Sequence, residues 1–237
     1  MPPRYHCWSL AAGVLIWLVV ASSGCEARPS ASEPTFRELI EQVRRGEATE
    51  IVVAGEPVGD GELAILGDLS DLTHLAIENF QGTRVGLETI AQLPNLERLQ
   101  LRGGDLGDEA MAVIARCANL NNLNLPDARF RDAGLAELKS LSQLELLRFH
   151  SVNVTDDGMA QIAAMESLRF LHLIGVPITD QGLAHLESMQ QLESLYIDDA
   201  RVTDEGLERL LKALPGLHLH INQQHSDRDP KKGSHPH

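Results

Sequence analysis

The sequence has few cysteines and few aromatic residues. It contains three cysteines in 237 residues, and phenylalanine, tryptophan and tyrosine together make up 4% of the chain. Cys7 and Cys25 lie close to the N-terminus, so Cys117 is alone in the remainder of the sequence. This number and placement exclude a disulfide framework and a cysteine-based zinc site. The scarcity of aromatic rings leaves few platforms on which a sugar could stack.

Positive charge is also scarce. Lysine and arginine number 20 against 34 aspartates and glutamates, so the formal net charge is −14. Such a surface disfavours nucleic acid and has no general attraction for anionic lipid. The sequence also lacks the G-x-S-x-G, P-loop, H-E-x-x-H and dinucleotide-binding patterns. We therefore predict a non-enzymatic protein that uses no cofactor, holds no metal and does not bind nucleic acid.

The longest apolar run near the N-terminus, Leu10 to Ala21, has 12 residues. It is too short to span a bilayer comfortably, but it suits the apolar part of a secretory signal. Arg4 precedes it, and the small residues 22–24 lead directly to Cys25. Small residues before a cysteine resemble a bacterial lipoprotein signal, in which the cysteine is lipidated and becomes the new N-terminus. A larger aliphatic residue is commoner in that family at the place of Ser22.

These features predict an N-terminal export device. We expect a signal peptide over residues 1–24, lipidation of Cys25, and a tether over residues 25–34 that holds the remainder off the membrane. The protein would then lie in a bacterial cell envelope, facing the periplasm or on the outer surface. The alternatives are a secreted protein whose signal is cut near Ala21 or Cys25, or a short membrane anchor.

A 24-residue period governs the sequence from Ala48 to Ile221 without insertion or deletion. Its unit begins with L-x-x-L-x-L, whose alternation predicts a short strand with one buried face. An apolar stripe spaced by three follows and predicts an amphipathic helix of about three turns. Cys117 falls on this stripe, which indicates a buried structural thiol. The period predicts seven units and a terminal strand in a solenoid, where function lies on a repeated surface. The first leucines of six units are Leu72, Leu96, Leu120, Leu144, Leu168 and Leu192.

An aspartate recurs where the strand half of each unit meets the helix half, except in the unit with Arg84. We expect each aspartate to accept hydrogen bonds from the first turn of its own helix and to complement the helix dipole. One carboxylate per unit is explained by such capping, which argues against calcium loops. Two residues later comes a glycine in most units, which we expect to let neighbouring turns approach closely. The aspartates are Asp60, Asp108, Asp132, Asp156, Asp180 and Asp204.

The segments 154–159 (VTDDGM), 178–183 (ITDQGL) and 202–207 (VTDEGL) resemble leucine-rich repeats. They are similar to the I/V-T-D-x-G-L subclass shared by ribonuclease-inhibitor-like and F-box-associated repeats and by many bacterial leucine-rich-repeat proteins. The resemblance implies an α/β solenoid over residues 48–221. In it, a parallel β-sheet lines the concave face of a curved, horseshoe-like array and α-helices lie on the convex face. One departure concerns the position eight residues after the first leucine, where many members have Asn or Cys. Small apolar residues are expected to replace that asparagine ladder.

The two ends of the solenoid differ in composition. Thr35 and Glu38 fit a capping box and Gly46 fits a helix stop, so we expect a capping helix within residues 35–47. Residues 222–237 are polar and have no apolar stripe, so we expect a disordered tail.

Side chains two, four and six residues after each first leucine point away from the predicted core. Arginine and aromatic residues, which are favoured in protein-recognition hot spots, gather there. We predict a protein- or peptide-binding face, although a merely solvated face is an open alternative. His150 and His172 lie about 8 Å apart by strand geometry without a third ligand, so we predict no metal site. The predicted binding residues are Arg98, Arg102, Asn122, Asn124, Arg148, His150, Phe170, His172, Tyr196 and Asp198.

Three functional classes remain open from the sequence. The favoured one is an exported, lipid-anchored interaction module that binds a protein or peptide through this face. An intracellular adaptor like the repeat part of F-box proteins, which choose ubiquitylation substrates, is the second. A purely structural envelope protein is the third.

Overall fold

The computed structural model describes residues 34–222 and 224–225. The predicted signal peptide, the lipidation site Cys25 and all but the last residue of the predicted tether lie outside these residues, as does the chain beyond His225. No helix in the described part is both long and apolar enough to cross a membrane.

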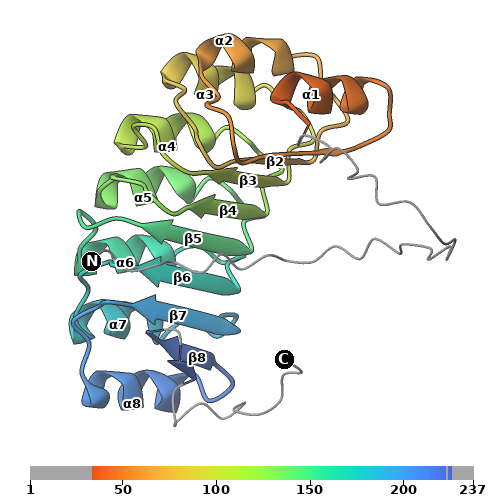
Figure 1. The fold of residues 1–237 in the computed structure, drawn as a ribbon. Coiled ribbons are helices and arrows are strands. Elements are labelled where there is room, and N and C mark those ends of the chain that lie inside the picture. Colours follow the sequence, from red (N-terminus) through yellow and green to blue (C-terminus); the bar gives the residue numbers. More distant parts are fainter. Residues whose placement is uncertain (1–33, 223, 226–237) are drawn as a thin grey trace, which may run out of the picture. The chain divides into compact units, whose positions relative to one another are not determined.

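Eight parallel strands form one open sheet in which neighbours in sequence are neighbours in space (Figure 1). Each residue pairs with the residue 24 positions later, as Leu99 does with Leu123. The 24-residue period therefore sets the register directly. The strands are β1 (Glu50–Val53), β2 (His74–Ile77), β3 (Arg98–Leu101), β4 (Asn122–Leu125), β5 (Leu146–His150), β6 (Phe170–Ile174), β7 (Ser194–Asp198) and β8 (His218–Ile221).

A helix follows every strand from β1 to β7, and α3 to α8 lie along one face of the sheet (Figure 1). Helices α3 to α8 have seven to ten residues, which is about two to three turns. Most are shorter than we predict, because the last apolar residue of the stripe lies in the turn after the helix. The helices are α1 (Phe36–Arg44), α2 (Asp60–Leu63), α3 (Arg84–Ile90), α4 (Asp108–Ile114), α5 (Asp132–Leu138), α6 (Asp156–Ala163), α7 (Asp180–Leu186) and α8 (Asp204–Ala213), with a 3₁₀ turn at Ala64–Leu66.

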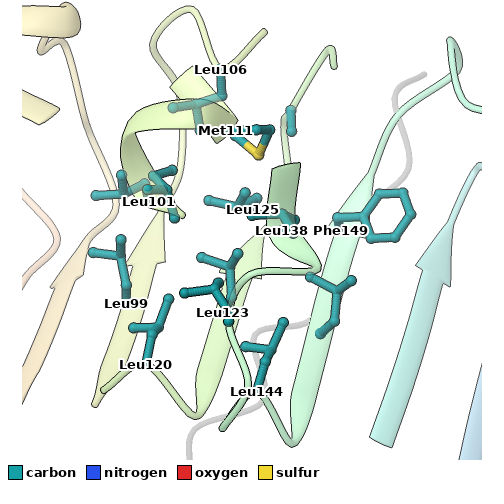
Figure 2. Close-up of a cluster of buried hydrophobic side chains, with 14 of the residues drawn as sticks. Leu99, Leu101, Leu106, Met111, Leu120, Leu123, Leu125, Leu138, Leu144 and Phe149 are labelled. Carbon is teal, nitrogen blue, oxygen red and sulfur yellow. The ribbon is translucent and has the colours of Figure 1, made fainter. Parts of the chain in front are cut away.

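The core lies between the sheet and the helices. Leu99, Leu101, Leu123 and Leu125 project from β3 and β4 toward Met111 of α4, and all five are almost completely buried (Figure 2). Burying one such side chain contributes about 1.5–3 kcal/mol, and each unit buries its apolar face partly against the next. The alternating strands and the repeated stripe thus produce the α/β leucine-rich-repeat solenoid that the sequence predicts.

The recurrent aspartates bond across units, which corrects the prediction that each caps its own helix. Asp156 Oδ1 accepts the backbone N–H of Thr179 at 2.7 Å, and Asp156 Oδ2 accepts its hydroxyl at 2.6 Å. Thr179, not an aspartate, caps α7, because its Oγ1 accepts the N–H of Gln181. Asp60, Asp132 and Asp180 bind the next unit's threonine in the same way. Each aspartate is already the first residue of a helix, so its carboxylate is free to reach the following turn.

We call these bonds between successive units the aspartate ladder. The recurrent glycine of the following unit packs against it, as we expect. A Cβ added to Gly206 would lie 2.2 Å from Oδ1 of Asp180 in the preceding unit. No side chain fits there without movement, since such a distance is far inside van der Waals contact. Neighbouring helical turns therefore approach closely only because the residue is glycine.

Different side chains occupy the position eight residues after the first leucine, where many leucine-rich repeats have asparagine. Ala128 and Val176 are buried there, as the prediction of small apolar packing requires. Val152 is instead 63% exposed, which makes the prediction wrong at this unit. The preceding residue, Ser151, takes over inside the turn, where its hydroxyl donates to the Phe130 carbonyl at 2.6 Å. A buried hydroxyl thus supplies the polar contact that an asparagine would make.

Helix α1 packs against β1 at the N-terminal end of the stack through Phe36, Ile40 and Val43, which are buried. Thr35 and Glu38 form the capping box of α1. Gly46, at φ +69°, follows the helix. A helix therefore covers core residues that no preceding repeat could cover.

The C-terminal end departs from the prediction of a disordered tail over residues 222–237. A short strand, β9 (Gln224–His225), pairs antiparallel with β8, and the Asn222 side chain accepts the Asp199 N–H at 2.9 Å. The prediction is therefore wrong for these residues. A strand at the edge of a sheet has unpaired backbone groups, and a hairpin satisfies them without needing apolar side chains. A polar composition consequently does not reveal it.

Candidate functional site

The face of the sheet opposite α3 to α8 carries the candidate site, and we call it the open face. Its side chains alternate with the buried leucines along each strand, so they come from the positions two, four and six residues after each first leucine. The parallel register stacks them into rows across the sheet. Nine of the ten predicted binding residues lie in β3 to β7, and Arg102 directly follows β3.

A continuous hydrogen-bonded row crosses the centre of the open face, from the residue after β2 to β7, and we call it the polar row. Its members are Glu78, Gln100, Asn124, Arg148, His172 and Asp198. Gln100 Nε2 donates to Glu78, and Gln100 Oε1 accepts from Asn124 Nδ2 at 2.7 Å. Asn124 Oδ1 accepts from Arg148 Nη1 at 2.8 Å. Arg148 Nε donates to His172 Nδ1 at 3.2 Å, and His172 Nε2 lies 2.9 Å from Asp198 Oδ2.

Arg148 sits in the middle of the polar row between neutral partners. Its guanidinium is half-buried and donates to an amide oxygen and an imidazole nitrogen. Burial is the largest reason that its pKa is lowered from the ordinary arginine value, and the positive charge of Arg102 acts in the same direction. Arg102 differs, because its Nε donates to Glu78 at 2.6 Å and Asp127 lies 3.9 Å from its Nη1.

The contacts of His172 define one tautomer. Because a guanidinium only donates, Nδ1 must be the unprotonated nitrogen, and Nε2 carries the proton that goes to Asp198. Burial lowers the pKa of His172 below its ordinary value; the hydrogen bond that His172 donates to Asp198 raises it, and the charge of Arg148 lowers it further. The net direction favours the neutral ring, which agrees with the geometry.

A cluster of rings continues the row beyond His172. Tyr196 stacks on His220 with centroids 4.1 Å apart and planes at 9°, and the His172 ring lies 5.2 Å from the Tyr196 ring. Nε2 of His220 lies 2.6 Å from Nε2 of His218. His218 and His220 are 6% and 8% exposed. This end of the open face is consequently tightly packed.

A second row, two residues nearer the start of each strand, lies beside the polar row. It pairs Arg98 with Asn122, Asn122 with Leu146 and Leu146 with Phe170. Arg98 is exposed, and Phe170 is 36% exposed. An apolar pair therefore lies next to Arg148, on the same face and two residues earlier along the strands.

Only some of the predicted binding residues contact one another in the structure. The polar row contains Asn124, Arg148, His172 and Asp198, whereas His150 pairs with Ile174 and stands apart from His172. The prediction omits Glu78, Gln100 and His220, which lie at the same repeat offsets and could be found by extending the count to every unit. Among the described residues, no three His, Cys, Asp or Glu side chains gather as metal ligands.

Comparisons with known proteins agree with this architecture. Residues 92–115 match the family model described as Leucine Rich repeat. A search of curated proteins finds no match. Among solved structures, an internalin C2 from Listeria monocytogenes is similar, with a TM-score of 0.57 and 21% identity over 82% of this chain and 79% of that chain. A plant peptide hormone receptor, RGFR1 in complex with RGF2, matches with a TM-score of 0.49 and 20% identity over 76% of this chain and 29% of that chain.

The repeat match and the internalin likeness, together with the open sheet of parallel strands, show a leucine-rich-repeat fold. At these identities the likeness concerns the fold. What the chain binds must be argued from its own open face.

Proposed function

We propose that this chain is a non-enzymatic interaction module that binds a protein or peptide on the open face. The observation that carries this proposal is the polar row, in which Arg148 and His172 are held by their neighbours in one arrangement. Side chains already fixed in place lose little freedom on binding, so more of the contact energy is kept as affinity. Arginine and aromatic residues are also the usual centres of binding energy.

The composition of the open face supports a macromolecular partner over a small molecule. Tyr196, Phe170, Arg98 and Arg148 lie on four strands between β3 and β7, and neighbouring strands of a sheet are about 4.8 Å apart. This spread suits an extended ligand that contacts several units at once. The chain as a whole has a net charge of −14. The arginines of the open face are therefore a local feature of this surface and do not reflect the overall charge of the protein.

A pull-down from cell-envelope extract tests this proposal. The variant carrying Arg148→Ala and Tyr196→Ala should lose the partner that the unaltered protein recovers. A matched control carries Val85→Ala and Lys139→Ala, two exposed residues away from the open face, and should recover the partner fully. Crosslinking and mass spectrometry would then map the contact to β3–β7. Equal recovery of the partner by both variants would rule out the open face as its binding site. If the unaltered protein recovers no partner at all, a purely structural role is favoured.

We further propose that the protein is exported and anchored through a lipid on Cys25. The support is in the sequence, where the apolar run of residues 10–21 leads through small residues to Cys25. Cells fed radiolabelled palmitate should yield labelled protein, and globomycin should block its processing. Cys25→Ser should abolish the label and Cys7→Ser should not. If the protein reaches the envelope without label, the lipid anchor is wrong, and the protein is secreted or tethered in another way.

A further inference from the structure

We propose that Arg148 anchors a carboxylate-binding site, which takes a peptide carboxylate that lies next to an apolar side chain. This inference rests on the proposed function and names the chemistry of its ligand. It starts from the partners of Arg148, since both hydrogen bonds that the structure gives its guanidinium go to neutral acceptors, Asn124 and His172.

Arg148 has no ion pair with a carboxylate among residues 34–222. Other arginines of this part do, including Arg44, Arg102 and Arg169. The nearest acidic member of the polar row, Asp198, bonds instead to His172 Nε2. A half-buried guanidinium with only neutral partners retains its charge and most of its donors, including both N–H groups of Nη2.

The orientation of Arg148 suits a bound carboxylate. Its Nε and Nη1 each donate to one neighbouring strand, so the planar group is held from both sides. A guanidinium presents its donors in a fork that matches the two oxygens of a carboxylate. The two existing bonds reduce the side-chain entropy that binding would otherwise cost. The site is therefore preorganised for one anion.

The surroundings of Arg148 add an apolar subsite and a second positive charge. Leu146 and Phe170 are cross-strand partners on the same face, two residues earlier along β5 and β6. Two strand residues span about 7 Å, a distance that a peptide bridges between a carboxylate and a neighbouring side chain. Arg98 lies in the same row as Leu146 and Phe170 and is exposed. An acidic, apolar peptide segment therefore complements this part of the open face in charge and in polarity.

Nuclear magnetic resonance titration of the purified, ¹⁵N-labelled protein tests the site. The probes are N-acetyl-leucine, which has a C-terminal carboxylate, and N-acetyl-glutamate α-amide, which has a side-chain carboxylate. N-acetyl-leucinamide has the same apolar group as the first probe without the charge. The acids should shift the Arg148 Nε–H resonance and the β5 and β6 amides, and the amide should not. The acid with the lower dissociation constant identifies the source of the carboxylate in the natural ligand.

Substitutions then assign the effect to Arg148. Arg148→Lys keeps the charge but loses the fork, and should weaken binding of the acids by about tenfold. Arg129→Lys, at an exposed arginine outside the strands, should bind as the unaltered protein does. Arg148→Gln should abolish the shifts while circular dichroism and the melting temperature show that the fold is retained. If the uncharged amide shifts the same resonances equally, or if folded Arg148→Gln binds the acids unchanged, the proposal is overturned.

The outcome is separable from that of the pull-down. If the Arg148 and Tyr196 double variant loses its partner but the acids shift nothing in the unaltered protein, the carboxylate site is wrong and the interaction face stands. If the acids bind at Arg148 but no envelope partner depends on the open face, the site stands and the proposed function falls.

Discussion

The Nε–H of Arg148 donates to Nδ1 of His172 at 3.2 Å, and this contact decides which form of the imidazole fits the fold. A proton on Nδ1 would remove the acceptor and set two positive groups against each other. The opposite ring nitrogen already uses its proton toward Asp198. Burial, followed by the charge of Arg148, keeps the pKa of His172 lowered despite the opposing effect of the hydrogen bond that His172 donates to Asp198.

This relationship predicts how stability depends on pH. The pKa of His172 is lower in the folded protein than in the unfolded chain, where it is about 6.5. As the pH falls, the unfolded state therefore binds the proton first. The contribution of His172 to stability is fully present above the pKa of the unfolded state and is lost as the pH drops toward the lower pKa of the folded state. Urea unfolding at about pH 7.5 and about pH 5.5 should show this loss. His172→Gln should reduce it, whereas His185→Gln, at an exposed residue of α7, should leave it unchanged. An identical pH dependence in the His172→Gln protein would contradict the assignment.

The fold is predictable from the sequence because one period sets three things at once. A 24-residue spacing places Leu99 opposite Leu123 in the sheet, puts both on the buried face, and brings the intervening helix back to the same side. No long-range pairing has to be guessed, since each unit contacts its neighbours. The sequence predicts only the positions of the polar row, because its bonds depend on how unlike side chains such as Gln100, Asn124 and Arg148 reach one another.

The aspartate ladder shows a second limit of the sequence. The spacing places Asp156 at a helix start, and capping of its own helix is the local explanation. The bond to Thr179 depends on the distance between successive units, which no single repeat contains. The prediction of a disordered tail is wrong at β9 for a different reason. This strand is held by backbone pairing with β8, which the polar composition of the segment does not reveal.

The ladder predicts a difference between two adjacent aspartates. Asp156→Ala should destabilise the protein by about 1–3 kcal/mol, because it leaves the backbone N–H and the hydroxyl of Thr179 without their acceptor. Asp157→Ala removes the same charge from the same helix end, but that exposed residue lies outside the ladder. It should cost only about 0.3–1 kcal/mol. Urea unfolding of both variants measures the difference, and equal losses would show that the helix dipole alone accounts for the Asp156 effect.

Cys117 provides a test of burial in the helix stripe. The thiol is 3% exposed, and burial raises its pKa to about 11. At pH 8 only about one molecule in a thousand would then carry a thiolate, which is the form that reacts. Iodoacetamide should leave the Cys117 peptide unmodified in the folded protein and alkylate it fully in urea, as followed by peptide mass spectrometry. Alkylation at similar rates in both conditions would place Cys117 outside the core.

Two glycine-to-alanine changes should have opposite effects on stability. At Gly206 the added Cβ would meet Oδ1 of Asp180 at 2.2 Å, so the ladder must shift, at a cost of about 1–3 kcal/mol. At Gly61, in helix α2, nothing lies within 4 Å of the added Cβ. Alanine there should stabilise the protein by about 0.4–1 kcal/mol, because it restricts the unfolded chain and not the fold. Thermal unfolding of the two variants checks both signs. A Gly206→Ala protein as stable as the unaltered one would mean that successive helical turns can move apart without loss, and that the close approach is not needed to hold the solenoid together.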